Sequence, residues 1–258
     1  YTILVVDDNP DMTDFLKRTF EGYFKRIIIA GDGVEALQLV RSHVPDIIVS
    51  DVMMPRMNGY KLCKTIKEDI NISHIPVILL TARDDRQSQI SGYKNGADGY
   101  LSKPFEVEML MELIRNRLKN REYTKKRYLN AGLIPTPEES TISLTDETFL
   151  IKLNSIIQEN IENSNLGIQF ICQEVGLGRS SLYNKLKALT GMGANEYISK
   201  LRIEKAITLI SGTDMPFSEI AEKTGFTTPS YFSTAFKQYT GETPSQYKER
   251  KKKGLAGK

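Results

Sequence analysis

Residues 47–55 read Ile-Ile-Val-Ser-Asp-Val-Met-Met-Pro. An apolar run leads through Ser50 to Asp51, and Pro55 stands four residues further on. The chain opens on a similar pattern, because Ile3-Leu4-Val5-Val6 precedes two aspartates. Short apolar runs of this kind alternate with amphipathic segments of helical length through the first half. We expect strands over 3–6, 27–30, 47–50, 77–80 and 99–101, and helices near 12–24, 34–43, 57–69, 86–95 and 106–119. This alternation indicates βαβ units, and therefore a parallel sheet with helices on both faces.

Polar side chains follow the predicted strands at one edge of this sheet, where functional residues of such folds gather. These side chains are Asp7, Asp8, Asp51, Thr81 and Lys103. Three carboxylates at one edge repel one another unless a cation lies between them, and Mg²⁺ suits carboxylates, water and a phosphate. A single acid after a strand can simply cap the next helix, as we expect of Asp11. The combination at four strand ends predicts a functional site.

Four segments of the first half resemble the receiver domain of bacterial response regulators. They are Val6-Asp7-Asp8-Asn9, Ser50-Asp51-Val52-Met53-Met54-Pro55, Leu80-Thr81-Ala82 and Gly99-Tyr100-Leu101-Ser102-Lys103-Pro104-Phe105. The resemblance covers about residues 1–120. It implies an α/β flavodoxin-like (βα)5 fold with strand order 2-1-3-4-5. It also implies a cis bond between Lys103 and Pro104.

The resemblance assigns a role to each residue at the strand ends. Asp51 would be the phosphoacceptor that takes a phosphoryl group from a phosphohistidine. Asp8, Asp51 and the backbone carbonyl of Met53 would hold Mg²⁺, and Asp7 would help through bound water. Lys103 would pair with one phosphoryl oxygen, while Thr81 would hydrogen-bond another. Thr81 would then move inward and Tyr100 would turn toward the vacated space; Tyr100 as a packed strand aromatic is the alternative.

The second half has helical periodicity and contains an internal repeat. Ile171, Gly176 and Leu177 match Ile220, Gly225 and Phe226, and Lys187, Thr190, Gly191 and Tyr197 match Lys237, Thr240, Gly241 and Tyr247. Each copy reads as a short helix, a turn at Gly176 or Gly225, and a second helix, which is the pattern of a helix-turn-helix. A helix over 149–160 precedes the first copy, and a longer helix over 195–211 joins the two. We therefore expect an all-α domain with two helix-turn-helix units.

This duplicated unit resembles the AraC-type DNA-binding domain over about residues 149–250. The segments that carry the resemblance are 181–187, 220–226 and 231–237. The family places two recognition helices in successive major-groove segments, about 34 Å apart. We expect DNA contacts from Arg179, Ser180, Tyr183, Asn184, Lys187, Ser230, Ser233, Thr234 and Lys237. Many members carry Arg where this chain has Asn184 and Thr234, which should change the preferred sequence. Leu182, Leu186, Phe232 and Phe236 are expected in the core.

The charge distribution favours the second half as the partner of a polyanion. The formal net charge is +3, and residues 121–258 carry its excess of basic residues. Six basic residues lie between Gly176 and Ile210: Arg179, Lys185, Lys187, Lys200, Arg202 and Lys205. We expect this group to be the electrostatic footprint on DNA phosphates. The C-terminal run from Lys248 to Lys253 could also touch phosphate, although a solvated tail is the favoured interpretation.

Composition narrows the remaining choices. The two cysteines, Cys63 and Cys172, argue against a disulfide framework or a cysteine-based zinc site and fit a reducing compartment. No apolar stretch approaches the roughly 18 residues of a membrane span. We expect a receiver over 1–120, a linker over 121–146, the DNA-binding domain over 147–250 and a basic tail over 251–258. The expected location is cytoplasmic.

These features favour a two-component response regulator, in which a histidine kinase phosphorylates Asp51 and thereby controls sequence-specific binding to double-stranded DNA. We expect a homodimer when the protein is phosphorylated; RNA polymerase is a further candidate partner. Receivers that pair through ionic contacts usually carry charges where this chain has Met109 and Leu113, so an apolar contact is an alternative. Pairing would raise DNA affinity through effective concentration.

Other functions remain as alternatives. The chain starts at Tyr1 without a methionine or a signal peptide, so we expect a piece of a longer chain. It resembles the C-terminal part of hybrid two-component sensors, in which a histidine kinase precedes the receiver on the cytoplasmic side of a membrane receptor. A Mg²⁺-dependent phosphatase usually needs a second carboxylate two residues after the nucleophile, where this chain has Met53. The expected protein is therefore a phosphoacceptor and not an enzyme, and the doubled helix-turn-helix argues against a pure protein-interaction module.

Overall fold

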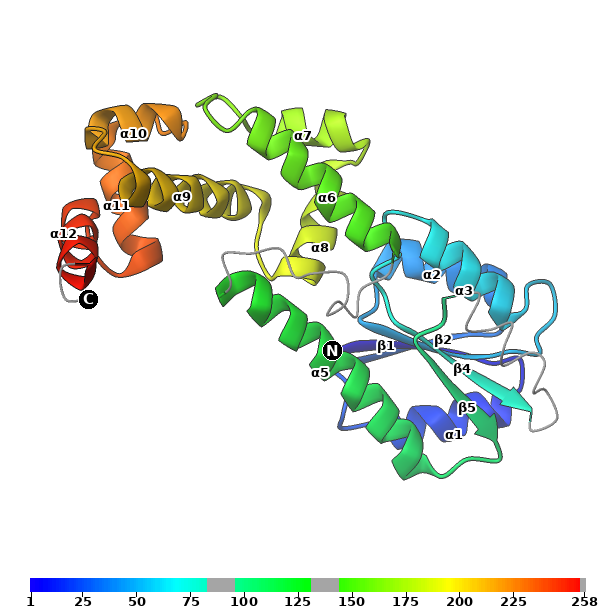
Figure 1. The fold of residues 1–258 in the computed structure, drawn as a ribbon. Coiled ribbons are helices and arrows are strands. Elements are labelled where there is room, and N and C mark those ends of the chain that lie inside the picture. Colours follow the sequence, from blue (N-terminus) through cyan, green and yellow to red (C-terminus); the bar gives the residue numbers. More distant parts are fainter. Residues whose placement is uncertain (83–95, 131–143, 256–258) are drawn as a thin grey trace. The chain divides into compact units, whose positions relative to one another are not determined.

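The computed structural model describes residues 1–82, 96–130 and 144–255 (Figure 1). The chain divides into two compact units, one built on the first 130 residues and the other on most of the chain from Phe149 onward. Each unit is treated separately below. The helix predicted near 86–95 and the Pro-rich segment 134–140 lie outside the described residues.

The first unit contains a five-stranded parallel sheet in the order β2-β1-β3-β4-β5, which confirms the predicted fold and strand order. The strands are β1 (Thr2–Val6), β2 (Arg26–Ala30), β3 (Ile47–Asp51), β4 (Val77–Ala82) and β5 (Gly99–Lys103). Their register pairs Val6 with Ser50, Asp51 with Leu80, and Ala82 with Lys103. The carboxyl ends of four neighbouring strands therefore meet at one edge, where the predicted site lies.

Helices cover both faces of this sheet, as Figure 1 shows. They are α1 (Pro10–Phe20), α2 (Gly33–His43), α3 (Gly59–Glu68) and α5 (Val107–Asn130). One buried cluster packs α2 and α3 against alternate strand residues, including Leu4, Ile48 and Leu79. A second cluster packs α1 and α5 against the opposite face. Burial on both faces explains why the strands read as continuous apolar runs.

Helix α5 is longer than the sequence predicted, because it continues from the expected end near 119 to Asn130. Residues 120–130 contain no proline or glycine that would stop a helix. The extension is also supported by a 2.8 Å ion pair between Lys125 and Glu122, one helical turn apart. The first part of the expected linker over 121–146 is thus helical.

The second unit consists of helices, and its internal repeat is visible in the element order. The elements are α6 (Leu144–Glu159), α7 (Ile168–Val175), α8 (Arg179–Thr190), α9 (Ala194–Gly212), α10 (Phe217–Lys223), α11 (Pro229–Thr240) and α12 (Pro244–Leu255). Helices α7–α8 and α10–α11 form the two predicted helix-turn-helix units, and α9 joins them. Gly176 and Gly225 occupy the two turns with φ of +71° and +73°, a conformation that favours glycine.

The predicted core of each helix-turn-helix unit is confirmed. Leu182, Leu186, Phe232 and Phe236 are at most 1% exposed. In the second unit of the repeat, Phe232 lies 5.7 Å from Phe236 between ring centroids, in an edge-to-face arrangement. Helix α12 extends to Leu255, so the first residues of the basic tail expected over 251–258 are helical; lysine is a good helix former.

We expect substitution of Gly59 by alanine to destabilise the first unit. A Cβ at Gly59 would lie 2.3 Å from the carbonyl oxygen of Asp51 and 3.0 Å from Cα of Val52. Both neighbours are backbone atoms, so α3 must shift away from β3, at about 1–3 kcal/mol of unfolding free energy. Urea denaturation followed by circular dichroism measures this loss.

Gly31 provides the matched control for this prediction. An added Cβ there would meet only the end of the Glu35 side chain, at 3.6 Å. We therefore expect Gly31→Ala to retain nearly the unfolding free energy of the original chain. Equal stability of the two variants would contradict the steric argument.

Candidate functional site

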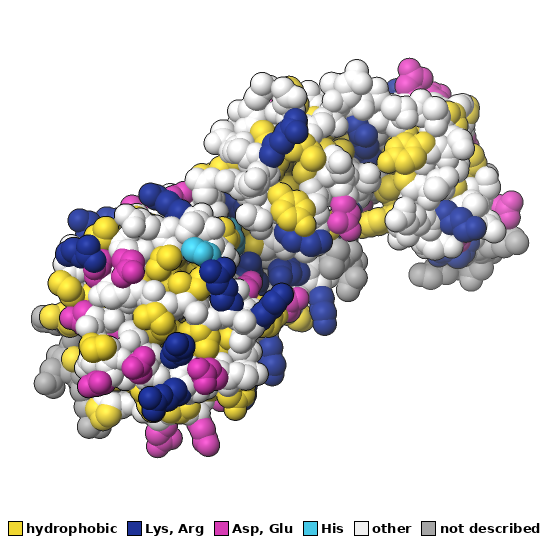
Figure 2. Space-filling model, turned by 180° about the vertical axis from the view of Figure 1, so that it is seen from behind, with side chains coloured by type: hydrophobic (Ala, Val, Ile, Leu, Met, Phe, Trp, Pro, Cys, Tyr) yellow, Lys and Arg dark blue, Asp and Glu magenta, His cyan; other side chains and the backbone are white. Residues whose placement is uncertain are grey.

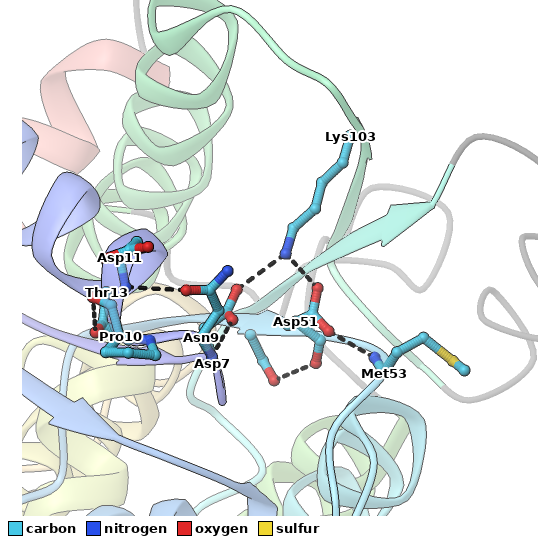
Figure 3. Close-up of polar contacts among 9 residues, drawn as sticks. Asp7, Asn9, Pro10, Asp11, Thr13, Asp51, Met53 and Lys103 are labelled. Atoms are coloured by element: carbon cyan, nitrogen blue, oxygen red, sulfur yellow. Dashed lines mark hydrogen bonds and ion pairs between the residues drawn. The ribbon is translucent and has the colours of Figure 1, made fainter.

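Two buried aspartates and one lysine meet at the carboxyl edge of the sheet. Asp7 follows β1, Asp51 ends β3 and Lys103 ends β5. The Lys103 Nζ lies 2.9 Å from Asp7 Oδ2 and 2.5 Å from Asp51 Oδ1, so the ammonium bridges the two carboxylates (Figure 3). Sequence reasoning placed these residues at one edge, but it did not anticipate that Lys103 would join both acids.

The other oxygen of each carboxylate accepts a backbone hydrogen bond. The Asn9 amide donates to Asp7 Oδ1 at 2.9 Å, and the Met53 amide donates to Asp51 Oδ2 at 2.7 Å (Figure 3). These short-range bonds follow from the turns that leave β1 and β3. They fix the orientation of both carboxylates before any ligand arrives, which reduces the cost of binding one.

Burial and ion pairing act against each other on Asp51 and Lys103. Burial raises the pKa of Asp51 above its usual value, although the hydrogen bond from Lys103 and its positive charge lower it in part. Burial likewise disfavours the charged form of Lys103, but hydrogen bonds to Asp51 and Asp7 outweigh it, and the pKa of Lys103 is raised. Lys103 is therefore held as an ammonium beside Asp51, and the carboxylate of Asp51 is poorly solvated.

The hydroxyl of Thr81 is positioned near the same edge of the sheet. Thr81 is 1% exposed, and among the described residues its Oγ1 has no hydrogen-bond partner. Buried hydroxyls are normally paired, so this one suits an acceptor that arrives with a ligand. Tyr100, in the next strand, is partly buried and packs against the cluster beneath α2 and α3.

The arrangement of acids differs from a ready-made metal centre. Within the residues described here, no group of three or more His, Cys, Asp or Glu side chains could hold a metal ion. Lys103 lies between Asp7 and Asp51, and Asp8 is exposed. Carboxylate oxygens are nevertheless the ligands that Mg²⁺ prefers, so Asp7, Asp8 and Asp51 supply the kind of donor that this ion takes.

Sequence reasoning missed one further buried acid near this edge, Asp32. Asp32 follows β2, is buried, and accepts hydrogen bonds from the amides of Val34 and Glu35 at the start of α2. It also forms an ion pair with Arg56, which has a positive φ of 61° in the loop after β3. Its place two residues after a predicted strand was the signal that could have revealed it. The pair links the loops that follow β2 and β3.

In the first helix-turn-helix unit, the predicted DNA contacts lie on α8 and are exposed. Ser180, Tyr183, Asn184 and Lys187 have the i, i+3, i+4, i+7 spacing of one helical face. Arg179 begins the helix, and together with Ser180, Tyr183 and Asn184 it lines a groove. The polar face of α8 is therefore continuous.

In the second helix-turn-helix unit, Ser230, Thr234 and Lys237 are exposed on α11, whereas Ser233 is partly buried. The Thr234 hydroxyl donates a hydrogen bond to the carbonyl oxygen of Ser230 at 3.1 Å. Thr228 caps this helix by accepting the Tyr231 amide. The face of α11 is thus more neutral than that of α8.

The expected basic footprint between Gly176 and Ile210 needs correction. Lys185, Lys200 and Arg202 are only 0%, 5% and 8% exposed, so they are not available to DNA phosphates. Lys185 lies over the ring of Phe149, 5.1 Å from its centroid, and Lys200 pairs with Glu204. Figure 2 shows basic and acidic side chains interspersed over the visible face. Electrostatic attraction must therefore come from fewer cations than the sequence suggested.

The Lys103–Pro104 bond is cis, as expected. None of the helices that the structure describes is long and apolar enough to cross a bilayer.

Comparison with known families matches both halves of the chain. The family model "Response regulator receiver domain" matches residues 3–115, and the model "Helix-turn-helix domain" matches residues 171–250. "Response regulator MprA" from a Mycobacterium species (strain KMS) is 36% identical over 162 residues, which cover 58% of this chain and 69% of that protein. The receiver domain of the Francisella response regulator 1452 aligns with 38% identity and a TM-score of 0.41, over 46% of this chain and 96% of that chain.

Two further relatives extend well beyond the aligned region. "Histidine kinase P4" from Formosa agariphila is 41% identical over 249 residues, which are 96% of this chain and 18% of that protein. "DNA-binding response regulator MtrA" from Mycolicibacterium smegmatis is 36% identical over 50% of this chain and 56% of its own length. The chain thus spans a fifth to about a half of these relatives. By its two matched domains and their geometry, it belongs to the response regulators and joins a receiver domain to an AraC-type helix-turn-helix domain.

Proposed function

We propose that this chain is a two-component response regulator in which phosphorylation of Asp51 controls sequence-specific DNA binding and transcription. The observation that carries the proposal is the bridge from Lys103 to Asp51 and Asp7 in a chain that also has two helix-turn-helix units. The chain acts as a phosphoacceptor and regulator and not as an enzyme. Its phosphoryl donor is a histidine kinase.

The proposed chemical step is transfer of a phosphoryl group to Asp51. A carboxylate oxygen of Asp51 forms the new O–P bond while the N–P bond of the phosphohistidine breaks. The leaving electron pair stays on the imidazole nitrogen, which takes up a proton. Lys103 already lies 2.5 Å from Asp51 Oδ1, so it can pair with a phosphoryl oxygen as negative charge arrives.

The proposed metal site uses Asp8, Asp51 and the backbone carbonyl of Met53, with Asp7 acting through water. Bound Mg²⁺ would neutralise charge on the phosphoryl oxygens. Asp7 and Asp51 both contact Lys103 in the structure, so the chain's own cation compensates part of the same charge. Asp8 is exposed, and its carboxylate is accessible to an ion from solvent.

We expect Asp8→Asn to raise the Mg²⁺ concentration that gives half-maximal phosphorylation. The change removes one proposed anionic ligand, and loss of even an outer-shell partner of a ligand typically costs about 10–100-fold in metal affinity. A Mg²⁺ titration of phosphorylation by acetyl phosphate measures the shift in the half-saturating concentration. Asp11→Asn, an exposed acid on α1, is the control, and an identical titration curve for Asp8→Asn would reject its role.

The proposed switch uses Thr81 and Tyr100. The buried Thr81 hydroxyl, which has no hydrogen-bond partner among the described residues, would donate to a phosphoryl oxygen. Its inward movement leaves room for Tyr100, which is only partly buried, to turn. The receiver surface thereby changes and favours pairing of two molecules, with exposed Met109 as one candidate contact.

The proposed output is binding to double-stranded DNA. Arg179, Ser180, Tyr183, Asn184 and Lys187 of the first unit and Ser230, Ser233, Thr234 and Lys237 of the second are the proposed contacts. Asn184 could read adenine, and Arg179 could read guanine or bind phosphate. RNA polymerase is a further proposed partner, and the cytoplasm, where chromosomal DNA lies, is the proposed place of action.

A second candidate concerns the context of the chain. The match to "Histidine kinase P4" covers 96% of this chain but 18% of that protein. This supports a version of the same function in which the two domains are the output end of a membrane-bound hybrid histidine kinase. Sequencing the genomic region upstream of Tyr1 tests it, since a kinase core in the same reading frame is required. A Mg²⁺-dependent phosphatase is not favoured, because Met53 and not an acid stands two residues after Asp51.

A further inference from the structure

The two helix-turn-helix units are unequal at their turn glycines. Gly176 and Gly225 are equivalent in the repeat and share nearly the same φ, +71° and +73°. An added Cβ at Gly176 would meet nothing within 4 Å, whereas one at Gly225 would lie 2.2 Å from the carbonyl oxygen of Ile161. The backbone of the second turn is therefore pressed against the segment that follows α6, in the first half of the domain.

Arg202 of the joining helix α9 completes this contact. Its Nη2 donates to the carbonyl oxygen of Asn163 at 2.7 Å, and its guanidinium lies over the Phe226 ring, 5.9 Å from the centroid. An added Cβ at Gly225 would also meet Arg202 Nη2 at 2.9 Å. The Arg202 guanidinium thus touches both the segment after α6 and the turn of the second helix-turn-helix unit.

The guanidinium is in an unusual environment for an arginine. Arg202 is 8% exposed, and within the described part of the chain its Nε has no hydrogen-bond partner. Burial lowers its pKa below the ordinary arginine value. A buried cation with an incomplete set of partners costs stability, so a methionine would serve packing at least as well. This cost indicates that Arg202 serves to fix the relative placement of the segments that it touches.

The geometry that needs fixing is the relation between α8 and α11. Helix α9 runs from Ala194 to Gly212, about 28 Å at 1.5 Å per residue. The helix sets a length, and its C-terminal half already packs into the core formed with α10, α11 and α12. Contacts that reach back to the segment after α6 add a restraint on how the second helix-turn-helix unit is rotated. Two recognition helices must reach major-groove segments about 34 Å apart, so both distance and rotation have to be held.

We propose that Arg202 and Gly225 form a lock that holds the two helix-turn-helix units at one spacing and rotation, and thereby sets which half-site spacing the protein accepts. The role rests on the proposed DNA-binding function. Arg202 is a positioning residue in this proposal, because it is buried and acts through the placement of α8 and α11. An ion pair at the surface, Lys205 with Glu162 at 3.0 Å, joins α9 to the segment after α6 without reaching the turn at Gly225, and provides a comparison.

The lock can be tested without DNA by pulsed electron–electron double resonance on the full chain. Spin labels are placed at Asn184→Cys on α8 and Gln238→Cys on α11, both exposed positions. Cys172 is replaced by serine, while Cys63 is retained because it is buried and burial raises its pKa to about 12, which disfavours the thiolate that reacts with a spin label. The measured quantity is the distribution of distances between the labels.

We expect one narrow distribution in the parent chain and in Gly176→Ala, and a shifted or broadened one in Gly225→Ala and Arg202→Met. Gly176→Ala carries the same strain of an alanine at positive φ but no crowding, so it isolates the contact. Lys205→Met should also keep the parent distribution. Should Gly225→Ala fail to fold by circular dichroism, Arg202→Met decides alone. An unchanged distribution in a folded Arg202→Met chain overturns the lock.

A DNA experiment tests the consequence for specificity. The probe is a duplex selected from a random pool by the parent chain, compared with versions that carry extra base pairs between the half-sites. We expect the parent to bind the altered spacings at least about tenfold more weakly, since only one unit then engages, and Arg202→Met to lose that discrimination. Retained discrimination in Arg202→Met overturns the proposal. If the parent selects no duplex, the proposed function fails while the distance measurement still judges the lock.

Discussion

Replacement of Asp51 by asparagine should abolish phosphorylation of the chain by acetyl phosphate in the presence of Mg²⁺. The carboxylate of Asp51 is the proposed nucleophile, and a neutral amide oxygen does not form a stable phosphoryl adduct. The environment also favours a reactive carboxylate, because burial raises the pKa of Asp51 while Lys103 holds one of its oxygens at 2.5 Å. Intact-protein mass spectrometry detects the added phosphoryl group directly.

The variant should remain folded, which separates loss of the nucleophile from loss of structure. A raised pKa means that burying the charged form of Asp51 is unfavourable, and the amide removes that cost. We therefore expect thermal unfolding at the same temperature as the parent chain or above it. Asp14→Asn, an exposed acid on α1, should still be phosphorylated. A phosphoryl group on the Asp51→Asn chain would reject Asp51 as the acceptor.

The first half could be predicted closely because its signals are local. An acid placed after an apolar run marks a strand end, and parallel strands bring such ends to one edge. Asp7, Asp51 and Lys103 accordingly meet in the structure. The bridging position of Lys103 is a tertiary property, since it depends on how far a side chain from β5 reaches across β4 and β3, and no local pattern encodes that reach.

The second half shows where a count of charges fails. Arg202 lies four residues after Ile198 and four before Ala206, both buried on α9, so its helical position already placed it on the inner face. Counting it as an exposed cation ignored that spacing. Lys185 follows Leu182 by three residues and is buried for the same reason. The periodicity of a charged residue with its apolar neighbours predicts its burial better than the local net charge does.

Because fewer cations are exposed than the sequence suggested, DNA affinity should fall less steeply with salt than a count of all basic residues predicts. With Lys185, Lys200 and Arg202 buried, the exposed proposed cations are Arg179, Lys187 and Lys237. Three phosphate contacts per chain predict a slope of about −2.7 in a plot of log affinity against log salt concentration, and two paired chains predict about −5.4. Raising salt from about 50 to about 200 mM should therefore weaken binding about 40-fold for one chain and about 1,800-fold for a pair.

Fluorescence anisotropy with a duplex selected by the parent chain measures this slope, and a scrambled duplex of the same composition serves as the reference. Lys187→Ala should reduce the magnitude of the slope by about 1 per chain and lower the affinity for both duplexes alike, because a phosphate contact carries no base preference. Lys17→Ala, an exposed lysine on α1 of the first unit, removes the same charge and should leave the slope unchanged.

Acetyl phosphate with Mg²⁺ should move the slope from the single-chain value toward the paired value if phosphorylation acts by pairing. A flat salt response, or equal affinity for the selected and scrambled duplexes at every salt concentration, would contradict regulated recognition of DNA by α8 and α11.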